Sequence, residues 1–122
     1  MLLGLARGSG ARSLSGMRAA EGIYRRPFLN VDRETVRSEV KDLVAFEDPH
    51  NSDTKFARVR VRNSVLPSLE SELGPGVTQA LVRSADLLRD DADALDALAR
   101  FEITRVGDDV NLIGALPRAI RT

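Results

Sequence analysis

The sequence predicts an α+β fold: a small three-stranded sheet that includes a C-terminal β-hairpin, covered by three or four helices, with an extended N-terminal arm. Three observations support this prediction. Residues 56–62 alternate apolar and charged side chains with a period of two, as a strand does. Two apolar runs, 101–106 and 110–113, flank a Gly-Asp-Asp turn. Between these segments the apolar residues recur at helical spacing.

Residues 1–28 are predicted to form a basic flexible arm, and residues 29–122 a single α+β domain, since 122 residues suit one hydrophobic core. The first 20 residues contain four glycines and three serines, which cannot hold a helix or strand without outside contacts. Segment 1–26 has five arginines and one glutamate, a charge of +4, so the rest of this neutral chain carries −4. We therefore expect the arm to contact an anionic partner through Arg7, Arg12, Arg18, Arg25 and Arg26.

The first helix is predicted from Asp32 to Phe46. Asp32 is a residue type that caps helices, and the apolar residues after it fall at i, i+4, i+7 and i+8. Residues 47–53 consist of turn-forming types, and Pro49 disfavours helix at the residue before it. A loop is expected there.

The predicted strand 56–62 places Ala57, Val59 and Val61 on one face and Arg58, Arg60 and Arg62 on the other. Three like charges on one strand face repel, so acids, water or a ligand must offset them. These three arginines are therefore a candidate face for nucleic acid or for a protein partner, with an exposed sheet face paired to neighbouring acids as the alternative.

Two helical stretches are expected between the strand and the terminal hairpin. Ser64 can cap a short helix that tolerates Pro67 in its first turn and stops at Gly74-Pro75-Gly76. Residues 78–100 then form one kinked helix or two. Gly107-Asp108-Asp109 is expected as the three-residue loop of the hairpin.

Groups able to carry catalysis are few. His50 is the only histidine, and with Asp48 and Asp53 it could serve a small metal-dependent enzyme, although these residue types are also what a loop needs. The Gly107-Asp108-Asp109 turn resembles the metal-binding turn of template-dependent polymerases, but it also suits a plain hairpin. An acidic run indicates a solvated helix face: Asp86, Asp90, Asp91, Asp93 and Asp96. The chain has no cysteine, no Walker loop and no dinucleotide fingerprint, so we expect no catalytic residue, no metal site and no cofactor.

The strand, the Ser64 helix, the glycine turn and the helix that opens at Thr78 together resemble the ribbon-helix-helix DNA-binding family over residues 56–90. That resemblance implies a dimer whose paired strands read the major groove through Arg58, Arg60 and Arg62. Pro67 and the terminal hairpin depart from the family's pattern.

The arm also resembles a mitochondrial presequence, being rich in arginine and serine and free of acids until Glu21.

The leading prediction is a non-enzymatic structural or assembly subunit that docks into a larger complex, a virion head or tail or a mitochondrial assembly. A DNA-binding regulator is the alternative. The expected partners are protein subunits, including copies of the chain, with nucleic acid possible through the arginine face. The compartment is left open between virion, cytoplasm and mitochondrial matrix. No membrane span is expected, because no stretch approaches about 20 apolar residues.

Overall fold

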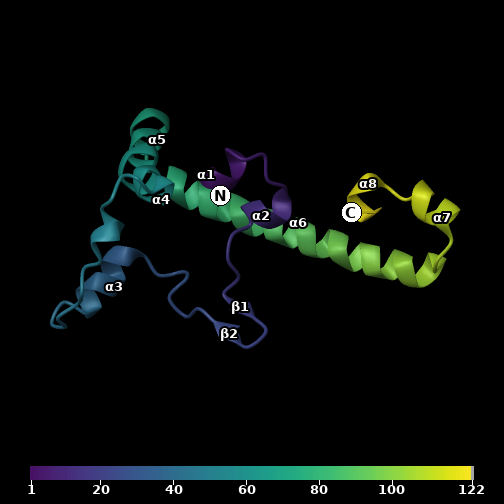
Figure 1. Ribbon diagram of the computed structural model, residues 1–122, viewed down its shortest axis with the longest axis horizontal. Coiled ribbons are helices and arrows are strands. Elements are labelled where there is room, and N and C mark those ends of the chain that lie inside the picture. The colour runs from purple at the N-terminus through teal and green to yellow at the C-terminus, as the bar shows by residue number, and fades with distance from the viewer. Residues whose placement is uncertain (122) are drawn as a thin grey trace.

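The computed structural model describes residues 1–121, which are mostly helical and arranged around one long helix (Figure 1). In chain order the elements are α1 (Leu2–Leu5), α2 (Ala11–Leu14), β1 (Ala20–Glu21), β2 (Tyr24–Arg25), α3 (Arg33–Glu39), the 3-10 helix η1 (Pro49–Asn51), α4 (Ala57–Arg60), the π-helix η2 (Val61–Val65), α5 (Leu66–Leu73), α6 (Val77–Val106), α7 (Val110–Ala115) and α8 (Arg118–Arg121). The molecule is elongated, with α7 and α8 at one end of α6 and α3, α4 and α5 at the other.

The predicted α+β fold is wrong. The segment expected as a strand at 56–62 is helical from Ala57, and the segment expected as a hairpin at 101–113 consists of two helical stretches joined at 107–109. Within residues 1–121 the sheet consists of β1 and β2 alone, which pair antiparallel with Ala20 opposite Arg25 and Glu21 opposite Tyr24. The three-stranded sheet and its covering helices are therefore replaced by helices that pack on one another.

Helix α6 forms the axis of the molecule. Its 30 residues make it about 45 Å long at 1.5 Å per residue. Side chains that recur at i, i+4 and i+7 form its partly or fully buried stripe: Leu81, Ala85, Leu88, Ala92, Leu95 and Ala99. The stretch predicted as one kinked helix or two at 78–100 is thus a single helix that continues to Val106.

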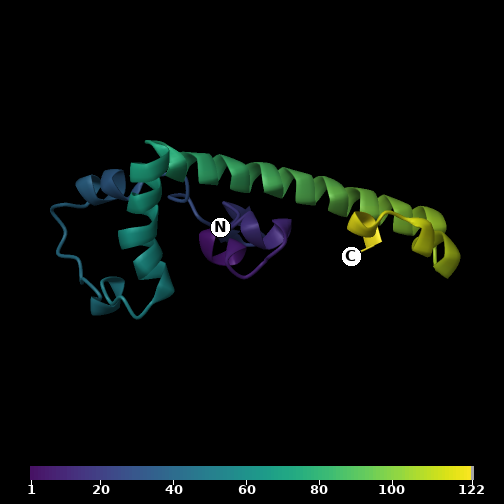
Figure 2. The same cartoon turned by 90° about the horizontal axis from the view of Figure 1, so that it is seen from above.

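The start of α6 is tied to α5 by Glu70. Its carboxylate accepts hydrogen bonds from the backbone N–H groups of Gly76, Val77 and Thr78 at 2.7, 3.2 and 2.7 Å. These N–H groups have no partner inside the helix, and a negative charge there also offsets the helix dipole. The bonds, that from Thr78 first, lower the pKa of Glu70. As a result the chain turns sharply, and α5 crosses the direction of α6 (Figure 2).

The stretch from α4 through η2 to α5 is one helical run in place of the predicted strand. A strand needs a neighbour to pair its backbone N–H and C=O groups, whereas a helix satisfies them internally. Val59 points inward in this run and is only 4% exposed. The predicted stop is confirmed, since α5 ends at Leu73 and Gly74 follows with φ of 93°. The ribbon-helix-helix resemblance fails with the strand on which it depends.

The predicted C-terminal hairpin is wrong because α6 extends through its first half. Val106, at the end of α6, is 8% exposed and continues the buried stripe. Gly107 then takes φ of 58°, which ends the helix. The carboxylate of Asp109 accepts hydrogen bonds from the N–H groups of Asn111 and Leu112, and so caps α7.

Helix α3 is shorter than the predicted helix 32–46. Its start is confirmed, because the Asp32 carboxylate accepts a 2.8 Å bond from the Thr35 N–H. It ends at Glu39, however, and the apolar residues after it are exposed, with Leu43 at 68% and Val44 at 105%. Without a surface to pack against, these side chains cannot extend the helix.

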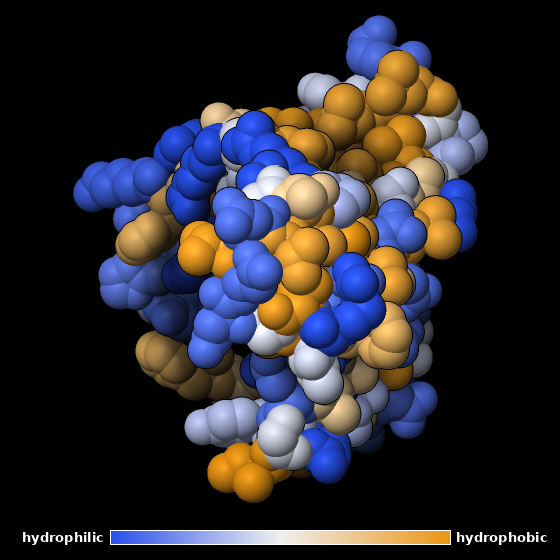
Figure 3. Space-filling view, turned by 90° about the vertical axis from the view of Figure 1, so that its right-hand side faces the viewer, coloured by the Kyte–Doolittle hydropathy of each residue, from blue (hydrophilic) through white to orange (hydrophobic). Residues whose placement is uncertain are grey.

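The buried apolar core of the described residues is small: Leu14, Val59, Ala92 and Val106. Many other apolar residues are exposed, and Figure 3 shows such side chains among hydrophilic ones on the end of the molecule that carries α7 and α8. Within residues 1–121, no helix combines the length and the apolar character that crossing a bilayer requires. The division into an arm, 1–28, and a domain, 29–122, stays a prediction.

Candidate functional site

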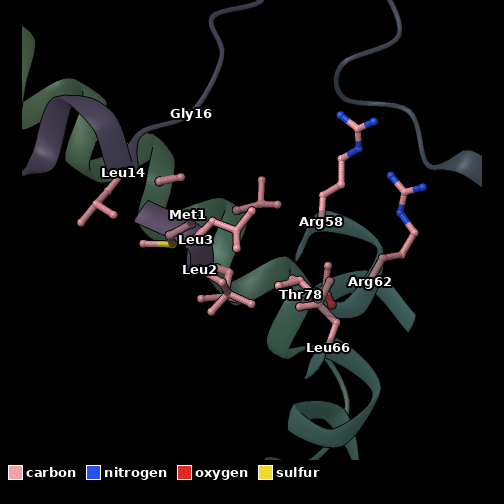
Figure 4. A pocket seen from close by; sticks show the side chains of 13 residues that line it. Met1, Leu2, Leu3, Leu14, Gly16, Arg58, Arg62, Leu66 and Thr78 are labelled. Atoms are coloured by element: carbon pink, nitrogen blue, oxygen red, sulfur yellow. The ribbon is translucent and has the colours of Figure 1, made fainter. Parts of the chain in front are cut away.

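An open pocket lies between the amino-terminal helices and the helical run from α4 to α6. It encloses about 380 Å³. Its apolar lining comes from α1 and α2 on one side and from η2, α5 and α6 on the other, as Figure 4 shows. The apolar side chains of the lining include Leu2, Leu3, Leu14, Leu66, Leu81 and Ala85. Thr78 contributes a hydroxyl group, and Arg58 and Arg62 stand at one edge.

The two arginines lie one helical turn apart, and their side chains extend in the same direction (Figure 4). Residues at i and i+4 share a helix face, whereas i+2 points elsewhere. Arg60 accordingly turns away and donates hydrogen bonds to the carbonyl groups of Thr54 and Lys55, at 2.7 and 2.8 Å. The predicted triple-arginine face is therefore split into a pair and a single, internally bonded arginine.

Arg58 and Arg62 are exposed, and among residues 1–121 neither forms an ion pair with an acidic side chain. The Arg58 guanidinium instead lies over the Phe56 ring, 5.2 Å from its centroid. A cation over an aromatic face is attracted by the ring without being neutralised. The pair thus presents two positive charges to solvent.

The arginines of the predicted arm have other surroundings. Arg12 bonds to Asp93 at 2.5 Å and also to Asp96, while Arg18 bonds to Asp93. The bond from Arg18, followed by that from Arg12, lowers the pKa of Asp93 to about 2. From α6, Arg89 donates to the carbonyl groups of Ser15 and Met17. The amino-terminal segment is therefore held on α6 by bonds that join residues more than 70 positions apart.

The remaining arm arginines contact the backbone or solvent. Arg25 donates to the carbonyl groups of Gly22 and Tyr24, and Arg26 donates to that of Arg18. Arg7 is exposed and forms no ion pair within residues 1–121.

The residues considered for a metal-dependent enzyme serve local structure. Asp48 caps η1, accepting from the His50 N–H at 2.9 Å and lying 2.9 Å from its Nδ1. Asp53 accepts from the Lys55 N–H at 2.9 Å. Asp108 lies in the loop beside the α7 cap. In the part of the chain that the structure describes, no group of three or more His, Asp or Glu side chains could hold a metal ion.

The acidic run is partly engaged rather than wholly solvated. Asp86 pairs with Arg89 at 2.6 Å, and Asp93 and Asp96 hold the arm arginines. Sequence reasoning missed these pairs, and it missed the pocket as well. The one signal available was the 3.6-residue spacing that links Val59, Leu66 and Leu69, which was outweighed by the six-residue alternation.

An exposed arginine pair beside an apolar pocket does not by itself define a class of protein. Comparison with known proteins does. A model of the PP-loop domain matches residues 1–69. Since this is more than half of the chain, the protein belongs to the PP-loop domain family.

The individual relatives are more specific. The chain is 56% identical to a tRNA(Ile)-lysidine synthase of Thermobifida fusca, in an alignment that covers 100% of the chain and 40% of that protein. It is 52% identical to the tRNA(Ile)-lysidine synthase of Streptomyces coelicolor, covering 99% and 37%, and 44% identical to that of Rhodococcus erythropolis, covering 99% and 39%. The chain thus spans about two fifths of the length of these relatives.

These comparisons overturn the predicted function. The family is the PP-loop domain family and the relatives are tRNA(Ile)-lysidine synthases, so the prediction of a structural or assembly subunit and the prediction of a non-enzyme are both wrong. Composition could not reveal the enzyme family, because a segment rich in glycine, serine and arginine is compatible with a docking arm and with part of an enzyme.

Proposed function

We propose that the protein acts in the formation of lysidine on tRNA(Ile). The observation that carries this proposal is similarity along the whole chain: the alignment with the Thermobifida fusca enzyme leaves no part of the sequence uncovered, at 56% identity. An RNA partner also suits the exposed arginines, since phosphate groups attract guanidinium groups that lack internal partners. The predicted protein-subunit partners receive no such support.

The PP-loop family implies ATP, and the apolar pocket beside Arg58 and Arg62 does not by itself make a site for it. The apolar pocket offers Thr78 as its only uncharged polar side chain, too few to recognise a purine base. The lining of this pocket also includes no carboxylate for the cation that accompanies nucleotide phosphates. The surroundings of Arg58 and Arg62 therefore support a role in holding RNA rather than ATP.

A chimeric enzyme tests the proposal. This chain replaces the matching segment of the Thermobifida fusca synthase, and the chimera is incubated with unmodified tRNA(Ile), ATP and lysine. Lysidine is then measured by mass spectrometry of the digested nucleosides. We expect formation within about tenfold of the parent enzyme, because the two segments are 56% identical throughout.

The control is the parent enzyme carried through the same cloning and purification. A chimera that folds, judged by its far-ultraviolet circular dichroism, yet makes no lysidine would contradict the proposed function.

A further inference from the structure

We propose that Arg58 and Arg62 form a clamp for the phosphate backbone of an RNA strand. This inference rests on the proposed function and adds the surface through which the chain would hold its RNA. It is based on the direction of the two side chains, their lack of acidic partners and the apolar pocket beside them.

The direction is set by the helical run. Residues 58 and 62 are separated by four positions in α4 and η2, so both guanidinium groups leave the same face. A guanidinium group offers a planar fork of donors, and two forks on neighbouring turns can bind one phosphate or two consecutive ones. Contact with the Phe56 ring restrains Arg58, so less freedom is lost when it binds.

The electrostatics distinguish this pair from Arg12, Arg18 and Arg89. Arg12 and Arg18 are engaged by Asp93, and Arg89 by Asp86. By contrast, the pocket beside Arg58 and Arg62 is lined by no acidic residue. An apolar wall lowers the local dielectric constant and strengthens attraction to an anion. The pair therefore places two positive charges one helical turn apart, both exposed and beside a pocket lined by no acidic residue.

The groups that the site lacks favour an RNA strand over a free nucleotide as its ligand. A nucleotide triphosphate would require groups for its base and carboxylates for its cation, and neither accompanies the pair within residues 1–121. A strand backbone requires only positive charge and donors, because phosphate contacts position the strand without reading its sequence.

The test compares two double variants of the full chain by fluorescence anisotropy with a labelled tRNA(Ile) transcript, at several salt concentrations. In Arg58→Ala/Arg62→Ala we expect the affinity to fall about tenfold or more. The slope of log affinity against log salt should become shallower by roughly 1.4 to 1.8, the value for two lost phosphate contacts. The variant Arg58→Lys/Arg62→Lys keeps the charges but loses the forks, so the salt slope should remain while affinity falls.

Arg33→Ala/Arg37→Ala is the matched control, since it removes two arginines of the same spacing from α3, one of which is paired with Glu47. It should leave both affinity and slope near the wild-type values. Equal effects of the two alanine pairs would overturn the clamp, as would loss of ATP binding in equilibrium dialysis with RNA binding intact. Circular dichroism establishes that each variant is folded. Failure of the chimera to make lysidine would refute the proposed function while leaving this binding result separate.

Discussion

Replacing Val59 by alanine tests the observed helical run most directly. Val59 is 4% exposed and is one of four buried apolar residues within residues 1–121, so little else can compensate for its loss. Removing two methyl groups costs about 1.6 kcal/mol in transfer free energy, at roughly 0.8 kcal/mol each, and an incompletely filled cavity adds up to about 1 kcal/mol. Alanine is the better helix former, which returns about 0.5 kcal/mol. We expect a net loss of about 1–2 kcal/mol.

The loss is measured by urea unfolding followed at 222 nm, with a fall in melting temperature of several degrees as a second measure. Val110→Ala is the matched control, since that valine is helical but 79% exposed and should change stability by less than about 0.5 kcal/mol. If Val59→Ala cost no more than the control, Val59 would not lie in the core, and the packing of α4 described above would be wrong.

Three further predictions concern helix ends and the amino-terminal segment. Asp93→Asn should loosen residues 11–18, seen as faster amide exchange there. The folded pKa of about 2 lies below the ordinary value of 3.8, so the stability difference from wild type should be full above pH 4 and vanish as pH falls towards 2. Glu70→Gln should speed exchange at the first N–H groups of α6 at neutral pH, and because the pKa of Glu70 is lowered, its effect should also shrink in acid. Gly107→Ala should cost about 1–2 kcal/mol through backbone strain alone, since its φ is 58° and no atom lies within 4 Å of the added carbon, whereas Gly114→Ala inside α7 should be neutral or stabilising.

The contrast at residues 56–62 explains why the fold class was mispredicted. Alternation of alanine or valine with arginine over six positions matches a strand, but so short a window also fits a helix with one buried residue per turn. Arginine and alanine are good helix formers, and Val59 is buried inside the helical run that α4 forms with η2 and α5. No partner strand is available within residues 1–121 to satisfy an extended backbone.

The arrangement of the candidate site was likewise only partly predictable from the sequence. The sequence was sufficient to single out Arg58, Arg60 and Arg62 as charges that need an explanation. It could not separate Arg60 from the pair, because the separation depends on helical rather than strand periodicity. Nor could it show that Asp93 neutralises Arg12 and Arg18, which lie 81 and 75 residues away along the chain.

The sequence by itself determined what depends on near neighbours: the cap at Asp32, the stop at Gly74-Pro75-Gly76, the break at Gly107 and the apolar stripe of α6. These features follow from backbone preferences and hydrogen bonds that close within a few residues. Tertiary structure decided whether an ambiguous segment became helix or strand, which charges are paired and where a pocket opens. Those outcomes depend on contacts between segments that are distant in the chain, and the free energy of such contacts is not contained in any local pattern.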